Sequence, residues 1–279
     1  MGGGGHRGGR IAIECPTSQY LSSQLIGCPL AEGDTAIRVP LLNEKPYVGM
    51  TLAWLDALGV PWQRDEGYGS FEVRGGRRYP AFERAVPADF SSATFFLVAA
   101  AVTGSELLLN GLDMQDTQGD KAVVRMMQEM GCQVAVEEDG IRIRGPHRLR
   151  GGTFDLNATP DALPSMAVAG AVAEGETRLV NVPQARLKET DRLSVMSREL
   201  RKMGAEVEEL PDGLVVRGGR LRGAQVEGHG DHRVVMALAV AGLAAEGATV
   251  VSTAEAVSVT FPTFVELMRA AGATIGTLP

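Results

Sequence analysis

The stretch Lys188-Glu189-Thr190-Asp191-Arg192 places two cations, two carboxylates and a hydroxyl side by side. Apolar residues recur at helical spacing over the following segment, 193–203, so a helix is predicted to begin near Thr190. The start of a helix presents unpaired N–H groups and a partial positive charge, which favour an anion. Enzymes hold phosphate or carboxylate with such cations while a neighbouring carboxylate moves a proton. Taken alone, the cluster also fits a solvated helix start with local ion pairs.

Composition limits the classes of protein to consider. The chain has 279 residues, of which 44% are hydrophobic, and a formal net charge of −7. That length allows two domains, and the negative charge argues against a general nucleic-acid or acidic-membrane surface. An anionic ligand would therefore need a local cationic site. The apolar runs are too short to predict a membrane span.

The three cysteines, Cys15, Cys28 and Cys132, show neither a paired framework nor metal-ligand spacing. This pattern favours reduced thiols and a cytoplasmic location. Residues 1–9 are rich in glycine and contain no apolar segment of the kind found in signal peptides. We therefore expect a flexible leader there.

A repeat of about 72 residues runs through the chain. Glycines that follow one series of predicted helices are Gly33, Gly104, Gly175 and Gly247, spaced by 71, 71 and 72 residues. Glycines that follow a second series are Gly59, Gly131, Gly204 and Gly272, spaced by 72, 73 and 68 residues. Glycine after the last apolar position is typical of a helix C-terminus, where a positive φ is wanted. Two series at one period make chance a poor explanation.

Each repeat is predicted to run strand, helix, strand, helix, strand, strand. The predicted elements are 10–14, 18–30, 35–39, 47–58, 62–64 and 70–74; 91–102, 106–110, 121–130, 133–137 and 140–144; 162–173, 177–182, 192–203, 206–210 and 213–217; and 232–245, 249–252, 262–270 and 273–275. The helices over 91–102, 162–173 and 232–245 are apolar almost all round, which indicates burial. We expect an α/β protein whose sheets surround a core of helices, with one repeat in a first lobe (10–80). A second lobe (81–279) would hold two full repeats and a third without its hairpin partner strand.

The first helices of the repeats open with polar residues: Thr17-Ser18-Gln19-Tyr20, Asp89-Phe90-Ser91-Ser92, Pro160-Asp161-Ala162 and Asp231-His232-Arg233. Each could be an ordinary helix cap. Equivalent helix starts in a repeat fold lie at one end, so together they could line one anion-binding cleft. His232 alone is more often structural, but Arg233 in a first turn, where acidic residues are preferred, argues for a bound anion.

These motifs together resemble the 5-enolpyruvylshikimate-3-phosphate synthase family. The resemblance extends over residues 10–276 and rests on Lys188-Glu189-Thr190-Asp191-Arg192, Asp231-His232-Arg233, Pro160-Asp161-Ala162, Lys45-Pro46-Tyr47, Ser18-Gln19 and Thr260-Phe261-Pro262. It implies an inside-out α/β barrel built of βαβαββ repeats. It also implies transfer of the enolpyruvyl group of phosphoenolpyruvate to the 5-hydroxyl of shikimate 3-phosphate, with no metal or organic cofactor.

The resemblance also implies roles for single residues. On the shikimate side, Thr17, Ser18 and Gln19 would bind the phosphate, Tyr47 and Gln184 would contact the same substrate, and Asp161 would take the 5-hydroxyl proton. Lys188 would contact the shikimate side and the transferring groups. On the phosphoenolpyruvate side, Glu189 would help move the methylene proton, and Arg192 and Arg233 would hold the anion, with His232 nearby.

The sequence departs from the family pattern at several positions. Gln184 replaces a frequent Asn, Glu44 stands where a small residue is common, and Val259 occupies the position of a lysine in some members. About the first third of the usual chain has no counterpart, so we expect a separate N-terminal polypeptide to complete the fold. Two alternatives stay open: an enolpyruvyl transferase acting on UDP-N-acetylglucosamine, and a non-catalytic remnant that binds a partner or shikimate 3-phosphate.

Overall fold

The computed structural model describes residues 5–278. The chain forms two compact units, which are described separately below. Unit 1 runs to Val86 and includes Asp116–Gly119, and unit 2 comprises Pro87–Gln115 and the residues from Asp120 onwards. Part of the expected leader lies outside the described residues. The rest is held in place, because Gly8 N–H donates to the Glu32 carbonyl and Glu32 N–H donates to that of His6.

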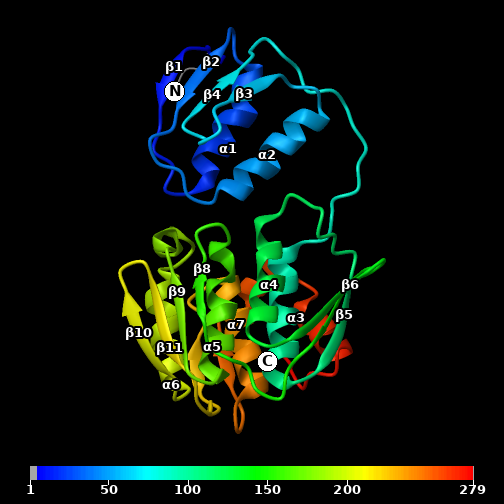
Figure 1. The fold of residues 1–279 in the computed structure, drawn as a ribbon, viewed down its shortest axis with the longest axis vertical. Coiled ribbons are helices and arrows are strands. Elements are labelled where there is room, and N and C mark those ends of the chain that lie inside the picture. The colour runs from blue at the N-terminus through cyan, green and yellow to red at the C-terminus, as the bar shows by residue number, and fades with distance from the viewer. Residues whose placement is uncertain (1–4, 279) are drawn as a thin grey trace. The chain divides into compact units, whose positions relative to one another are not determined.

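Unit 1 is one complete βαβαββ repeat. Its elements are β1 (Arg10–Ala12), α1 (Ser18–Gly27), the 3₁₀ turn η1 (Cys28–Leu30), β2 (Thr35–Arg38), α2 (Lys45–Ala57), β3 (Trp62–Arg64) and β4 (Ser70–Val73). The sheet order is β1-β2-β4-β3, with β1 parallel to β2 and the other neighbours antiparallel. Leu21 and Leu25 of α1, Leu52 and Leu55 of α2 and Phe71 of β4 are buried in a common core. The two helices therefore lie against one face of the sheet (Figure 1).

Unit 2 contains three repeats related to this plan, but among the described residues only the second has all six elements, because the first lacks the opening strand and the third lacks the closing hairpin. The first comprises α3 (Phe90–Thr103), β5 (Glu106–Asn110), the 3₁₀ turn η2 (Gly119–Lys121, which begins in unit 1), α4 (Ala122–Glu129), β6 (Gln133–Glu137) and β7 (Gly140–Arg144). The second comprises β8 (Thr153–Asp155), η3 (Pro160–Ala162), α5 (Leu163–Val172), β9 (Glu176–Val180), η4 (Pro183–Leu187), α6 (Arg192–Lys202), β10 (Glu206–Leu210) and β11 (Gly213–Arg217). The third comprises β12 (Gln225–Glu227), α7 (His232–Ala244), β13 (Val250–Ser252), η5 (Ala254–Val259) and α8 (Phe264–Ala270).

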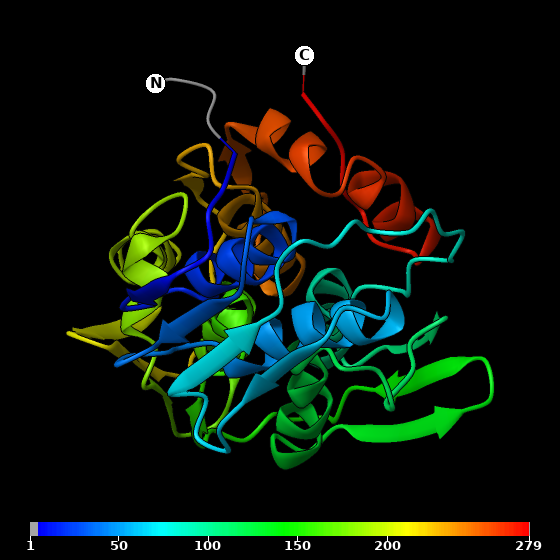
Figure 2. The same ribbon diagram turned by 90° about the horizontal axis from the view of Figure 1, so that it is seen from above.

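Helices occupy the inside of unit 2 and sheets the outside. The almost entirely apolar α3, α5 and α7 pack against one another, and most of their residues are buried. The sheets β5-β7-β6, β8-β9-β11-β10 and β12-β13 surround them (Figure 1). The hairpin of β6 and β7, green in both views, extends at the surface of the unit (Figures 1 and 2). The predicted arrangement of surface sheets around buried helices is confirmed.

The glycine series confirms the repeat at the level of the backbone. All eight glycines have a positive φ, from 66° at Gly59 and Gly104 to 104° at Gly131. Gly104 is the left-handed C-cap of α3. A residue with a Cβ would be strained there, which explains why glycine recurs at this period.

The structure differs from the predicted elements in the third repeat of unit 2. Residues 273–275, predicted as a strand, are not in a sheet. A strand needs a hydrogen-bonded neighbour, and the described residues supply none at this point. The three-residue strands β8 and β12 and the turn η4 were not predicted, because segments so short carry little periodicity. Within residues 5–278, no helix combines the length and hydrophobicity needed to cross a bilayer.

Candidate active site

The side chain of Asp161 is the centre of a charged cluster in unit 2. It lies in η3, just before α5. Its Oδ1 is 2.8 Å from Nη1 of Arg192, and its Oδ2 is 3.0 Å from Nη2 of Arg233. The Nζ of Lys188 lies 4.0 Å from the same Oδ1. Three cations from two separate segments, Lys188 and Arg192 in one and Arg233 in the other, thus converge on one carboxylate.

Arg192 contacts three carboxylates and so connects the members of the cluster. It is the first residue of α6 and only 1% exposed. Its Nε donates to Oδ2 of Asp231 over 2.8 Å, and its Nη2 donates to Glu189. A guanidinium can be buried in this way only when carboxylates surround it. The same Asp231 accepts hydrogen bonds from the N–H groups of Arg233 and Val234, so it also caps α7.

Charge sets the protonation of the cluster. Burial alone would raise the pKa of Asp161, but the nearby Arg233, Arg192 and Lys188 outweigh it and hold the pKa at about 2. Burial and the neighbouring Arg233 lower the pKa of His232, so its imidazole is neutral at pH 7. Asp161 is therefore a carboxylate at neutral pH. An anionic ligand would compete with it for the neighbouring cations.

The cluster has an accessible side. The Glu189 side chain is 49% exposed, whereas those of Asp161, Lys188 and Arg233 are largely but not fully buried. A ligand can reach Glu189, and the two partly open cations can hold an anionic group beside it. The arrangement can bind phosphate or carboxylate and move a proton with either of two carboxylates.

Sequence reasoning missed two buried carboxylates outside the charged cluster, Glu199 and Asp120. Glu199 is fully buried, and it accepts hydrogen bonds from Lys202 over 2.7 Å and from the backbone N–H of Glu227 over 2.9 Å. Asp120 accepts a 2.5 Å hydrogen bond from the hydroxyl of Thr159, next to the turn that carries Asp161. A signal for Glu199 existed, since it lies two helical turns after Arg192 and so on the same buried face.

Gln184 lies in η4, where it is buried. Its Nε2 donates to the Asn157 carbonyl over 3.0 Å, while its Oε1 has no hydrogen-bond partner in the described part of the chain. Val259, where a lysine occurs in some relatives, ends η5 and is exposed.

The remaining predicted binding residues lie together in unit 1. Ser18 begins α1, and Thr17 is its N-cap residue. Ser18, Gln19 and Tyr47 line an apolar cavity of about 520 Å³ between α1 and α2. The N–H and hydroxyl of Ser18 both donate to the carboxylate of Glu44. The start of α1 therefore already has an anion at its donor groups.

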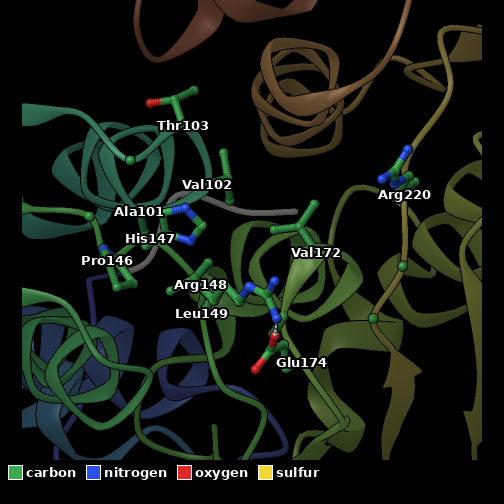
Figure 3. A pocket seen from close by; sticks show the side chains of 15 residues that line it. Ala101, Val102, Thr103, Pro146, His147, Arg148, Leu149, Val172, Glu174 and Arg220 are labelled. Carbon is green, nitrogen blue, oxygen red and sulfur yellow. Dashed lines mark hydrogen bonds and ion pairs between the residues drawn. The ribbon is translucent and has the colours of Figure 1, made fainter.

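A second cavity, of about 810 Å³, lies in unit 2 at the C-terminal ends of α3 and α5 (Figure 3). Its lining includes His147, Arg220 and an ion pair between Arg148 and Glu174, whose Nη1 and Oε1 are 2.6 Å apart. Asp161 precedes the other end of α5, about 15 Å away along the helix axis. None of the predicted site residues lines this cavity, so it is separate from the charged cluster.

Among the described residues, no group of three or more His, Cys, Asp or Glu side chains has the arrangement of a metal site. All three cysteines are free and buried. The assignment of catalytic and binding roles within the cluster stays a prediction.

Comparisons with known proteins agree with the resemblance. The family model of EPSP synthase (3-phosphoshikimate 1-carboxyvinyltransferase) matches residues 2–268. A 3-phosphoshikimate 1-carboxyvinyltransferase of Acetivibrio thermocellus is 56% identical over 271 residues, covering 97% of this chain and 64% of that protein. One from Methanocella arvoryzae is 46% identical, covering 92% of this chain and 61% of that protein.

Among solved structures, EPSP synthase from Acinetobacter baumannii matches with a TM-score of 0.80 and 30% sequence identity, covering 98% of this chain and 64% of that one. The chain thus spans 61–64% of the length of these relatives. The relatives contain the matched region within one chain, which gives no support to the expected separate N-terminal polypeptide. The family match, the fold and the motifs together show that this chain belongs to the EPSP synthase family.

Proposed function

We propose that this chain takes part in transfer of the enolpyruvyl group from phosphoenolpyruvate to the 5-hydroxyl of shikimate 3-phosphate, with release of phosphate. The observation that carries the proposal is the convergence of Lys188, Arg192 and Arg233 on Asp161, beside the accessible Glu189. The relatives are named as 3-phosphoshikimate 1-carboxyvinyltransferases, which supports the proposal. We expect the cytoplasm as the location, from the reduced cysteines.

The proposed reaction has two steps. In the first, the 5-oxygen bonds to the enol carbon, Asp161 takes the hydroxyl proton, and Glu189 delivers a proton to the methylene carbon. In the second, the tetrahedral intermediate loses phosphate, which receives the proton held by Asp161, and Glu189 takes back the methyl proton, which restores the double bond and the starting protonation of both carboxyl groups. Arg233 and Lys188 would hold the phosphate and carboxylate of phosphoenolpyruvate, so they neutralise the charge that leaves.

The low pKa of Asp161 fits this role only when substrate is bound. A carboxylate with a pKa of about 2 is a weak base at pH 7. Phosphoenolpyruvate would draw Arg233 and Lys188 towards its own negative groups and weaken their effect on Asp161. Binding of the anion would thus raise the basicity of Asp161 as the acceptor hydroxyl arrives.

The test is an assay of phosphate release from phosphoenolpyruvate and shikimate 3-phosphate. The purified chain should be assayed alone and fused to the first third of the Acetivibrio thermocellus relative, with product identified by mass spectrometry. Transfer in either form supports the proposal. Shikimate 3-phosphate binding without transfer in both forms would favour the non-catalytic alternative, and transfer only to UDP-N-acetylglucosamine would favour the other transferase.

A further inference from the structure

The N-terminus of α1 in unit 1 is occupied by a carboxylate of the chain itself. Oε2 of Glu44 accepts two hydrogen bonds, from Ser18 N–H over 2.9 Å and from the Ser18 hydroxyl over 2.7 Å. Glu44 is 1% exposed and Ser18 is also buried. One carboxylate oxygen therefore takes both donors of the first residue in the helix.

This contact replaces the usual local cap. Thr17 is the N-cap residue of α1, yet its side chain makes no cap hydrogen bond. Thr17 is only 7% exposed, and its buried Oγ1 has no hydrogen-bond partner within residues 5–278. A buried hydroxyl of this kind normally finds a partner. The helix start thus retains an unused polar group beside the two donors that Glu44 takes.

The backbone of Glu44 has an unusual left-handed conformation. Glu44 has a φ of 59°, in the left-handed region that few residues with a Cβ adopt. It is the N-cap residue of α2, but its side chain makes no cap hydrogen bond to that helix. A strained conformation kept at a helix junction is a reason to look for a role in function.

We propose that Glu44 is an internal competitor for the phosphate of the acceptor substrate. This rests on the proposed function and on the predicted role of Thr17, Ser18 and Gln19 in binding that phosphate. A phosphate placed on the Ser18 donors would meet the Glu44 carboxylate in a buried environment, where two like charges repel strongly. The phosphate must therefore displace Glu44, which makes Glu44 a determinant of affinity for the phosphorylated acceptor.

The alternative is that Glu44 only stabilises the start of α1, as acidic groups do at helix N-termini. The two cases predict opposite changes in anion affinity when the Glu44 carboxylate is removed. A merely structural Glu44 would, on removal, leave anion binding unchanged or weaken it. A competing Glu44 would, on removal, free the Ser18 donors and tighten anion binding.

The experiment measures binding of inorganic phosphate and of shikimate 3-phosphate to the full chain by calorimetry. The variants are Glu44→Ser, which removes the carboxylate, and Glu44→Gln, which keeps the shape without the charge. We expect at least about tenfold tighter phosphate binding in both. Glu14→Gln, an exposed residue nearby in the sequence, controls for the loss of one negative charge and should not change the affinity.

Ser18→Ala in the Glu44→Ser background tests whether the gain in phosphate affinity depends on the Ser18 hydroxyl. This second substitution should abolish the gain. Phosphate should also raise the melting temperature of Glu44→Ser more than that of the wild type. Equal or weaker phosphate binding in Glu44→Gln would overturn the proposal, and this variant keeps the test valid if Glu44→Ser does not fold. Tighter phosphate binding in the variants, with no enolpyruvyl transfer by the chain either alone or fused, would support the competitor and refute the proposed function. Transfer with the same KM for shikimate 3-phosphate in all variants would support the proposed function and refute the competitor.

Discussion

Arg192 and Asp231 form an ion pair that is almost wholly shielded from solvent. The Nε of Arg192 is 2.8 Å from Oδ2 of Asp231, and neither side chain is more than 1% exposed. The pair joins the start of α6 to the start of α7, and hence the Lys188–Arg192 motif to the Asp231–Arg233 motif. Two motifs separated by 39 residues in sequence are thereby fixed as one site.

Replacing Asp231 by Asn should destabilise unit 2 strongly, because Arg192 would keep its charge in a buried position with one partner fewer. Breaking a buried ion pair in this way typically costs about 3–5 kcal/mol. Urea unfolding followed by far-ultraviolet circular dichroism would measure the loss of unfolding free energy. Glu176→Asn removes a partly exposed partner of Arg178 and Arg217 and should cost no more than about 1 kcal/mol. Similar losses in the two variants would contradict the importance of the buried pair.

Glu199 should make stability depend on acid pH. Burial alone would raise its pKa, but Lys202, the Glu227 N–H, His229 and Arg198 lower it to about 2. Because the pKa is lower in the folded protein than in the unfolded chain, where it is about 4.3, the stabilisation is complete above that value. It is lost as pH falls from about 4.3 towards 2.

The measurement is the difference in unfolding free energy between wild type and Glu199→Gln, taken from pH 7 down to the lowest pH at which both fold. We expect the advantage of the wild type to shrink across the acid window. A difference that stays constant with pH would show that Glu199 acts by packing and not by charge. Glu206→Gln, on the exposed face of β10, serves as the control.

Glu189→Gln should reduce turnover by about 10²–10⁴-fold, the usual contribution of a general acid or base. Its melting temperature should change little, because half of the Glu189 side chain is exposed. Asp161→Asn should reduce turnover to a similar degree while keeping the size of the side chain. Both variants are assayed in whichever form of the protein shows transfer, and near-normal turnover in either would remove that residue from the mechanism.

The sequence predicted the repeat because its signals are local. Glycine at Gly104 or Gly131 reports a positive φ at a helix end, and uniform apolarity over 95–101 reports a helix buried on every side. The charged motifs likewise predicted which residues gather near Asp161. These features follow from a few neighbouring residues, so they can be recognised without a structure.

The remaining features depend on contacts between distant segments. The bond from Ser18 to Glu44 joins residues 26 apart, and that from Glu199 to the Glu227 N–H joins residues 28 apart. Glu44 was noted only as an unusual residue type, since its left-handed φ and its direction towards α1 are set by the packing of two helices. The strand expected at 273–275 failed for the same reason, because pairing needs a neighbour that no local pattern can supply.

An anion bound at the cluster should raise the pKa of Asp161. At present Arg233, Arg192 and Lys188 hold this pKa at about 2 against the effect of burial. Phosphoenolpyruvate would compete for Arg233 and Lys188, whose side chains are partly accessible, but not for Arg192, which is buried by Asp231 and Glu189. The carboxyl carbon of Asp161 can be followed by NMR in protein labelled at aspartate, assigned by comparison with Asp161→Asn. We expect its titration to move to higher pH on addition of phosphoenolpyruvate and to stay in place in Arg233→Gln at the same ligand concentration. An unchanged titration with phosphoenolpyruvate demonstrably bound would mean that the substrate does not share the cations of Asp161, and that another group takes the acceptor proton.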